Sequence, residues 1–351
     1  MKKVVKILLP FLVASTAVFS GCKDKNKNKD DNRVLISFGD VHATESRVID
    51  LAKLAEITNA KENFLFVVST NTCGCWSEFA PVLNNYLTSE KVVCYRMDFA
   101  NFKDAAATYG LANASSSTTT FAIFEDGKVK TFLNTANDSN IMYDVTKFKK
   151  YMEETIIKPS CYFITEDDIN TIKTSGEKAV IYFERSGCGD CSALNPGLLR
   201  EYVKNHSGMK KLYTFDCQDY WRADTAPDYQ DYLDKKTELG LSVEGNPNFG
   251  YGEGVFPYFS LIENGQYTSG CVIYNDKVEE VDGKRVVTES YYTTERVQTL
   301  EYTNKVIAGY EVPASELNDR GRWTREGKDN QYKEILNSFL DWALPKQTYN
   351  F

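Results

Sequence analysis

The sequence predicts an α/β chain in which one unit of strands and helices occurs twice. Two landmarks recur at a fixed separation: Cys73 and Cys188 are 115 positions apart, and so are Pro81 and Pro196. At each cysteine landmark, an apolar run typical of a buried strand comes before the cysteine and an amphipathic helical pattern follows it. With 351 residues, the chain is long enough for two domains, each with its own core. Matched landmarks over a long period indicate an internal duplication.

The second copy is organised around a strand-to-helix turn that carries two cysteines. Residues 179–184 form an apolar run rich in Val, Ile, Tyr and Phe, and Cys188-Gly-Asp-Cys191 follows it. Free backbone N–H groups and the helix dipole at such a turn favour a thiolate at Cys188. Cys191, three residues on, is near enough to close a disulfide with it. The expected helix has an apolar face formed by Leu194, Leu198, Leu199, Tyr202 and Val203.

The first copy shows the same order of elements. Its buried strand at 64–69 leads to Cys73-Gly-Cys75, and a helix follows. The other expected elements are a first strand at 33–38, a helix from Thr44, strands at 91–98 and 119–124, a short helix at 104–109, a turn at 125–127 and a returning strand at 129–133. Each copy ends in a closing helix with one apolar face: Val145, Phe148, Met152 and Ile156 in the first, and Tyr332, Ile335, Leu336, Phe339, Leu340 and Ala343 in the second.

Two segments of the second copy resemble the thioredoxin superfamily. The first is the strand, Cys188-x-x-Cys191 and a proline five residues on, Pro196. The second is residues 255–265, which look like the family's cis-proline strand ending in an Asn-Gly hairpin turn. The resemblance implies two tandem thioredoxin-like domains, each a central mixed sheet flanked by helices. It also implies that Pro257 is a cis-proline facing the cysteine pair. The second copy looks closest to the small accessory thioredoxin-like proteins of bacterial envelopes.

The resemblance implies thiol–disulfide exchange of the disulfide reductase or isomerase type. Cys188 would attack a substrate disulfide, Cys191 would resolve the mixed disulfide, and Pro257 would shape the surface that holds the substrate. The implied partners are thiols and disulfides of exported proteins, and a membrane electron donor that recharges the pair. No cofactor is expected. The competing interpretation is a redox-inactive binding or scaffold protein with the same fold.

Two residues near the cysteine pair depart from the family pattern. Asp190, between the cysteines, opposes formation of a thiolate, so the pair is expected to be a weaker oxidant than one with a basic residue there. Tyr182 occupies the place where thioredoxin has a buried acid that assists proton transfer. Glu184, two residues on and on the same face of the strand, is the candidate replacement for that acid.

The first copy departs further from the pattern. Counted from Pro81, Cys73 takes the place of the nucleophile and Trp76 that of the resolving cysteine, while Cys75 has moved inward. Thr119 stands where the cis-proline is expected. One interpretation is a second redox site at Cys73 and Cys75 that oxidises or isomerises substrates. Another is a degenerate copy kept for structure or binding. A third is copper(I) capture by the two thiolates, for which this copy offers only an upstream histidine.

The N-terminus carries the pattern of a lipoprotein signal peptide. Residues 1–21 contain three lysines followed by an apolar stretch, and Phe19-Ser-Gly-Cys22 resembles a bacterial lipoprotein cleavage box with Cys22 as the lipidated residue. Residues 22–32 are expected to be a flexible tether, because 23–32 are only Lys, Asp and Asn. The expected location is therefore the cell envelope, with the chain lipid-anchored to a membrane on its extracytoplasmic side.

The charge of the chain argues against nucleic acid as a partner. Cleavage before Cys22 removes three lysines and no acidic residue, which takes the formal net charge from −8 to −11. A chain this acidic repels nucleic-acid phosphates. No metal site is expected, because the cysteine spacing gives no zinc ribbon and the two histidines are isolated.

The expected domain boundaries are 33–157 for domain 1 and 161–345 for domain 2, with a proline between them that ends the preceding helix. Domain 2 carries an insertion at about 275–328, with an expected helix around 294–306. Four more cysteines fall on expected strands: Cys94, Cys161, Cys217 and Cys271. Buried free thiols are the default at such positions. A Cys161–Cys271 bridge is the alternative that an oxidising compartment allows.

Overall fold

The structure, a computed structural model, describes residues 32–36, 38–206, 211–223, 225–239, 256–274, 276–290 and 309–344. From Arg33 onward, these residues belong to one compact unit. The expected signal peptide, Cys22, nearly all of the tether and the helix expected at 294–306 lie outside the described residues. None of the described helices is both long and apolar enough to cross a membrane.

The first large sheet has five strands in the order β3-β5-β4-β6-β7. Strands β3, β5 and β4 run parallel, whereas β6 and β7 each run antiparallel to the strand before them, so the sheet is mixed. The strands are β3 (Arg47–Val48), β4 (Phe64–Ser69), β5 (Cys94–Asp98), β6 (Thr120–Glu125) and β7 (Lys128–Asn134). The helices of this half are α1 (Leu51–Asn59), α2 (Gly74–Glu90), α3 (Phe99–Phe102), α4 (Thr135–Met142) and α5 (Val145–Thr155).

The second large sheet has six strands in the order β13-β12-β10-β11-β9-β2. Strands β10, β11, β9 and β2 run parallel to one another. Strand β12 runs antiparallel to β10, and β13 runs antiparallel to β12. The strands are β2 (Phe38–Asp40), β9 (Cys161–Phe163), β10 (Ala179–Glu184), β11 (Leu212–Asp216), β12 (Tyr258–Glu263) and β13 (Gln266–Val272). The helices here are α6 (Glu166–Ser175), α7 (Gly189–Leu194), η1 (Asn195–Leu199), α8 (Arg200–Asn205), α9 (Tyr229–Glu238) and α11 (Arg325–Ala343).

The two sheets repeat one topology. The order β9-β11-β10-β12-β13 reproduces β3-β5-β4-β6-β7, with the same strand directions. Both hairpins turn through a glycine with positive φ, Gly127 and Gly265. A Cβ added at Gly127 would lie 2.2 Å from the carbonyl oxygen of Thr58, and one at Gly265 would lie 2.5 Å from that of Lys173, so only glycine fits either turn. The predicted fold class, with two mixed sheets flanked by helices, is confirmed; the domain boundaries stay a prediction.

The expected opening of the first copy is wrong. Residues 33–38 do not form its first strand, because β1 (Val34–Leu35) pairs with β8 (Ile156–Ile157) and β2 pairs with β9 of the second sheet. The helix expected from Thr44 begins at Leu51 instead, after β3. Asp50 caps it there by accepting the N–H of Lys53 at 2.8 Å.

Two further elements differ from expectation. The segment expected to be helical at 104–109 forms turns after α3. The single helix expected after Cys191 is divided into α7, the π-helical segment η1 and α8. Pro196 has no N–H to donate within the helix, and Gly197 has non-helical dihedral angles, φ −95° and ψ −112°. In the first copy, by contrast, Pro81 lies inside an unbroken α2.

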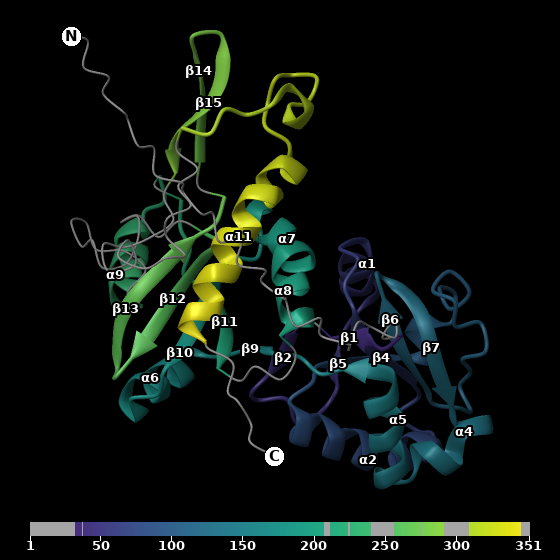
Figure 1. The fold of residues 1–351 in the computed structure, drawn as a ribbon. Helices are drawn as coiled ribbons and strands as arrows, with labels where there is room; N and C mark the ends of the chain where they lie inside the picture. Colours follow the sequence, from purple (N-terminus) through teal and green to yellow (C-terminus); the bar gives the residue numbers. More distant parts are fainter. Residues whose placement is uncertain are drawn as a thin grey trace, which may run out of the picture. The chain divides into compact units, whose positions relative to one another are not determined.

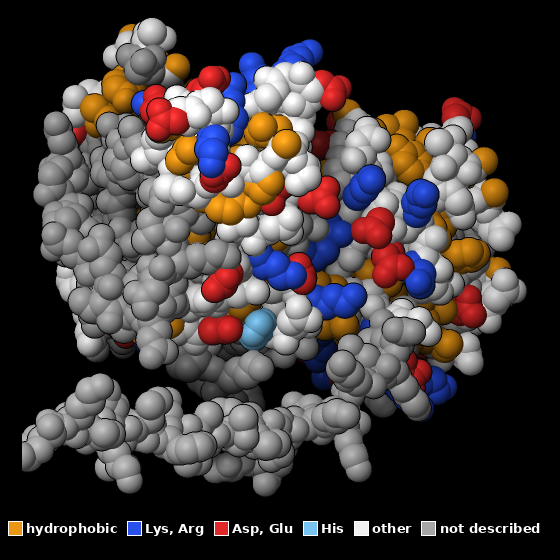
Figure 2. All heavy atoms as spheres, turned by 45° about the horizontal axis from the view of Figure 1, so that its top comes forward, with side chains coloured by type: hydrophobic (Ala, Val, Ile, Leu, Met, Phe, Trp, Pro, Cys, Tyr) orange, Lys and Arg blue, Asp and Glu red, His pale blue; other side chains and the backbone are white. Residues whose placement is uncertain are grey.

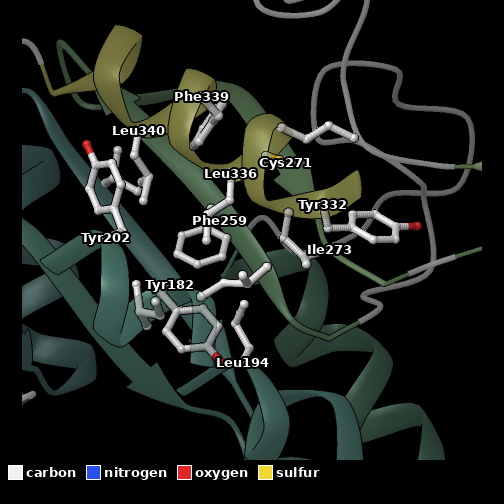
Figure 3. Packing of buried hydrophobic residues seen from close by; sticks show 14 of the residues in the cluster. Tyr182, Leu194, Tyr202, Phe259, Cys271, Ile273, Tyr332, Leu336, Phe339 and Leu340 are labelled. Atoms are coloured by element: carbon white, nitrogen blue, oxygen red, sulfur yellow. The ribbon is translucent and has the colours of Figure 1, made fainter. Parts of the chain in front are cut away.

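Helix α11 covers one face of the second sheet (Figure 1) and supplies much of its core. All six residues predicted for its apolar face are buried. Leu336 and Phe339 point toward the ring of Phe259 on β12, as Figure 3 shows. That ring stacks on Tyr182 of β10, with centroids 4.6 Å apart. The core therefore fixes the strand that leads into the cysteine motif.

Part of the predicted insertion is a hairpin of β14 (Asp276–Val281) and β15 (Lys284–Ser290), followed after undescribed residues by the short helix η4 (Ala314–Glu316). This segment fixes the start of α11. Thr324 accepts the N–H of Gly327 as its cap, and its own N–H donates to the carbonyl of Glu316 at 2.8 Å. A Cβ at Gly327 would lie 2.8 Å from Glu316 Oε2, so the first turn of α11 packs closely against η4.

The surface of the described residues mixes charges of both signs. Figure 2 shows Lys and Arg side chains interspersed with Asp and Glu on one face. Exposed pairs such as Lys333–Glu201 and Lys53–Glu56 fit this pattern. Such pairs stabilise the fold little, because solvent screens them.

Candidate active site

The two cysteines of the second copy lie where the sequence predicts, at the turn between a buried strand and a helix. All six residues of β10 are buried, and Cys188 is the N-cap residue of α7. The side chain of Cys188 is half-buried, whereas that of Cys191 is only 2% exposed. Both are free thiols. The accessible sulfur is therefore that of Cys188, with Cys191 behind it.

Pro257 lies opposite this pair. The Phe256–Pro257 peptide bond is cis, as expected from the sequence. The Sγ of Cys188 lies 3.8 Å from the carbonyl oxygen of Phe256. Pro257 is buried and directly precedes β12, and its carbonyl accepts the N–H of Ile273 at 3.1 Å. The structure thus brings together Cys188, Cys191 and Pro257.

The surroundings of Cys188 favour its thiolate. The side chain of Cys191 hydrogen-bonds the Cys188 sulfur and is the main cause that lowers the pKa of Cys188 from 9.0 to about 6. Partial burial acts in the opposite direction. The backbone N–H groups of Cys191 and Asp190 in the first turn of α7 lower the pKa further. The same hydrogen bond, together with burial, raises the pKa of Cys191, so only one thiol of the pair ionises easily.

A chain of hydrogen bonds runs from Cys191 to a buried carboxyl group. Tyr182 contacts the sulfur of Cys191, and its hydroxyl donates to Asn195 Oδ1 at 2.9 Å. Asn195 Nδ2 donates to Glu184 Oε2 at 2.6 Å, and Thr214 donates to the other oxygen at 3.2 Å. Burial raises the pKa of Glu184 to about 7. Glu184 is thus a buried acid near the pair, with Tyr182 and Asn195 between it and Cys191.

Asp190 has a partner that the sequence analysis did not identify. As expected, its negative charge raises the pKa of Cys188, but this effect is smaller than the lowering by Cys191. Arg325, the first residue of α11, donates to Asp190 Oδ1 at 2.5 Å. The guanidinium carbon of Arg325 also lies 4.2 Å from the centroid of the Tyr274 ring. Both charged side chains are 40% exposed, so this ion pair offsets the charge of Asp190 only partly.

The cysteine motif of the first copy contains a disulfide. Cys73 and Cys75 form a disulfide at the start of α2. Thr119 directly precedes β6, as Pro257 precedes β12, which fits the expected match between them. Its hydroxyl donates to the sulfur of Cys75 at 3.4 Å. Beside the disulfide, the guanidinium carbon of Arg96 lies 4.9 Å from the ring centroid of Trp76.

The remaining described cysteines are buried free thiols, as the default interpretation holds. The alternative bridge between Cys161 and Cys271 is wrong. Cys161 lies on β9 and Cys271 on β13, with β11, β10 and β12 between them in the sheet. Burial raises the pKa of both thiols, so neither is poised to react. Within the described residues, no three His, Cys, Asp or Glu side chains come together as metal ligands.

The strand order of both sheets and the cis-proline opposite the cysteine pair define a thioredoxin-like fold. No protein-family model and no curated protein matches the sequence. Among solved structures, the chain is similar to a mutant thioredoxin from Halobacterium salinarum, at 17% identity over 32% of this chain and 90% of that one, with a TM-score of 0.26. It is similar to Fasciola hepatica thioredoxin at 22% identity, 30% and 96% coverage and a TM-score of 0.24. It is similar to human ERp44 form I at 11% identity over 63% of this chain and 49% of that one, with a TM-score of 0.34.

Sequence reasoning missed two residues of this site. Asn195 adjoins Pro196, and a proline so close to a cysteine motif is a signal that the helix could be irregular there. Arg325 gave no signal, because it lies 135 positions from Asp190 and among other charged residues. Both residues act on the motif through tertiary contacts.

The pKa of Glu184 predicts a pH-dependent stability. In the unfolded chain the carboxyl ionises around its usual 4.5, whereas in the folded chain it does so at about 7. Its contribution is fully present below pH 4.5 and is lost as the pH rises to about 7, a change of about 3 kcal/mol. The matched comparison is between the parent and Glu184→Gln. The difference between their free energies of unfolding, parent minus variant, should fall by this amount from about pH 4 to about pH 8. Urea unfolding measures it; an equal difference at both pH values would contradict the assignment.

The Arg325–Asp190 pair predicts a change in thiol reactivity. In Arg325→Gln, Asp190 is unpaired and raises the pKa of Cys188, so alkylation by iodoacetamide below pH 6 slows about threefold, the scale of a partly exposed ion pair. Lys333→Gln, which removes another exposed cation of α11, is the matched control and should change nothing. In Asp190→Asn the Arg325 substitution should have no effect; an undiminished effect there would show that Arg325 acts by another route.

Proposed function

We propose that this chain performs thiol–disulfide exchange on exported proteins, with Cys188 as nucleophile. The observation that carries the proposal is the half-buried Cys188 sulfur, held with a pKa of about 6 between the Cys191 thiol and the cis-proline segment. At neutral pH such a thiol is mostly ionised, and the thiolate is the form that attacks disulfides. The fold alone would not support this, because it also serves proteins without redox activity.

The proposed reaction has two steps. The Cys188 thiolate attacks one sulfur of a substrate disulfide, so a mixed disulfide forms and the other substrate sulfur leaves as a thiolate. Cys191 then loses its proton to the leaving thiolate and attacks the sulfur of Cys188. This attack breaks the mixed disulfide and releases the second substrate thiol. The substrate disulfide is reduced to two thiols, and the Cys188–Cys191 pair is oxidised to a disulfide. A membrane electron donor is the proposed partner that reduces the pair again.

The two cysteines suit these different steps. Cys188 offers an accessible sulfur that ionises easily, whereas Cys191 is buried and keeps its proton until Cys188 is part of a mixed disulfide. Once the Cys188 sulfur carries no charge, the hydrogen bond that held the proton on Cys191 weakens. The hydroxyl of Tyr182, which contacts the Cys191 sulfur, then turns its proton from Asn195 to the Cys191 thiolate and stabilises it. The cis-proline segment is proposed to hold an extended substrate beside Cys188.

We also propose that the chain works on the extracytoplasmic side of a membrane, anchored by a lipid on Cys22. The signal pattern of residues 1–21 and the charged tether support this location. Such a compartment is one where protein disulfides persist and need reduction or rearrangement.

Assays with the mature chain test the proposed activity. It should reduce the disulfides of a model protein such as insulin, and Cys188→Ser should abolish this activity because the nucleophile is gone. Cys191→Ser should trap a mixed disulfide with an exported protein, visible as a thiol-sensitive species on a gel. The matched control is the double variant Cys73→Ser with Cys75→Ser, which removes the other motif and should leave insulin reduction intact.

Activity that survives Cys188→Ser would refute this role for Cys188. If the mature chain reduces no insulin and Cys191→Ser traps no partner, the second copy is instead a redox-inactive domain for binding or scaffolding.

A further inference from the structure

The disulfide of the first copy is asymmetric in its contacts. Both cysteines are partly exposed, but the sulfur of Cys75 contacts the segment before β6: the carbonyl oxygen of Ser117 is 3.8 Å away, and the hydroxyl of Thr119 donates to the sulfur at 3.4 Å. The sulfur of Cys73 accepts the N–H of Cys75 at 3.3 Å from within the motif itself. One sulfur thus accepts a hydroxyl donor from outside the motif.

Thr119 is held in place for this contact. The residue is fully buried, with 0% of its surface exposed. Its N–H donates to the hydroxyl of Thr135 at 2.9 Å, and its carbonyl accepts the N–H of Thr135 at 3.0 Å. Thr135 thus binds both backbone groups of Thr119, while the hydroxyl of Thr119 donates to the sulfur of Cys75. A buried hydroxyl that is positioned by the fold can stabilise charge without reorganisation.

We propose that Cys73–Cys75 is a second reactive disulfide, which accepts electrons from protein dithiols, and that Thr119 is a catalytic residue for the departure of Cys75. A substrate thiolate attacks the sulfur of Cys73, because Cys75, which accepts the Thr119 hydroxyl, is then the sulfur that leaves. The bond between Cys73 and Cys75 breaks, and its electron pair goes to Cys75, whose new charge the Thr119 hydroxyl stabilises. The hydrogen bond strengthens as this charge develops, so it lowers the barrier.

The remaining step completes an oxidation. The second thiolate of the substrate attacks the mixed disulfide, forms the substrate disulfide and releases Cys73 as a thiolate. The substrate loses two electrons and two protons, and Cys73 and Cys75 become two thiols. This activity goes beyond the proposed reduction at Cys188, since it runs in the opposite direction and uses neither Cys188 nor Cys191.

The test uses the mature chain with Cys188→Ser and Cys191→Ser, so that failure of the first proposal does not affect it. Reduced glutathione is the probe. After reaction, acid quenching and alkylation, mass spectrometry should find glutathione on Cys73 and the alkyl group on Cys75. Thr119→Val, which keeps the shape but removes the hydroxyl, should slow the reaction about tenfold, the scale of a hydrogen bond to a charged group. Thr119→Ser should restore the rate to within about twofold of the parent.

The matched control is Thr118→Val. The hydroxyl of Thr118 contacts Ser115 and Asn134 instead of the disulfide, so its loss should leave the rate unchanged. Glutathione found on Cys75, or an unchanged rate in Thr119→Val, would overturn the proposal. If Thr119→Val does not fold, the position of glutathione in the parent still decides which sulfur is attacked.

Discussion

The proposed active site depends on one hydrogen bond, which the thiol of Cys191 donates to the sulfur of Cys188. It assigns the negative charge to the accessible sulfur and the proton to the buried one. The fold provides the geometry for this bond, because a fully buried strand ends just before Cys188 and a helix begins directly after it. The backbone N–H groups of that first turn add to the same effect. A thiol pair in an extended loop would lack both contributions.

Other residues of the second copy affect the ionisation of this cysteine pair from two sides. On the buried side, Tyr182 contacts Cys191 and leads through Asn195 to Glu184, a carboxyl group that burial keeps protonated up to about pH 7. On the solvent side, Arg325 reaches Asp190 from the start of α11. The inserted segment before α11 fixes that start, so a surface elaboration of the fold contributes to the electrostatics of the motif.

Much of the fold and part of the site could be predicted from the sequence, because they depend on local pattern. The strands before each motif, the glycine turns and the apolar face of α11 follow from periodicity and from conformations that few residues adopt. The opening of the first copy could not be predicted, since β2 and β3 are only three and two residues long and either could serve as the first strand. Arg325 and the donor role of Thr119 depend on tertiary contacts, which no local pattern encodes.

Titration of the Cys188 thiolate, followed by its ultraviolet absorbance in the parent and in Cys191→Ala, tests the central claim most directly. If the Cys191 thiol supports the thiolate, the parent titrates at a pKa of about 6 and the variant moves toward the usual 9.0. A parent that titrates like an ordinary thiol, or a variant with the same midpoint as the parent, would contradict the account.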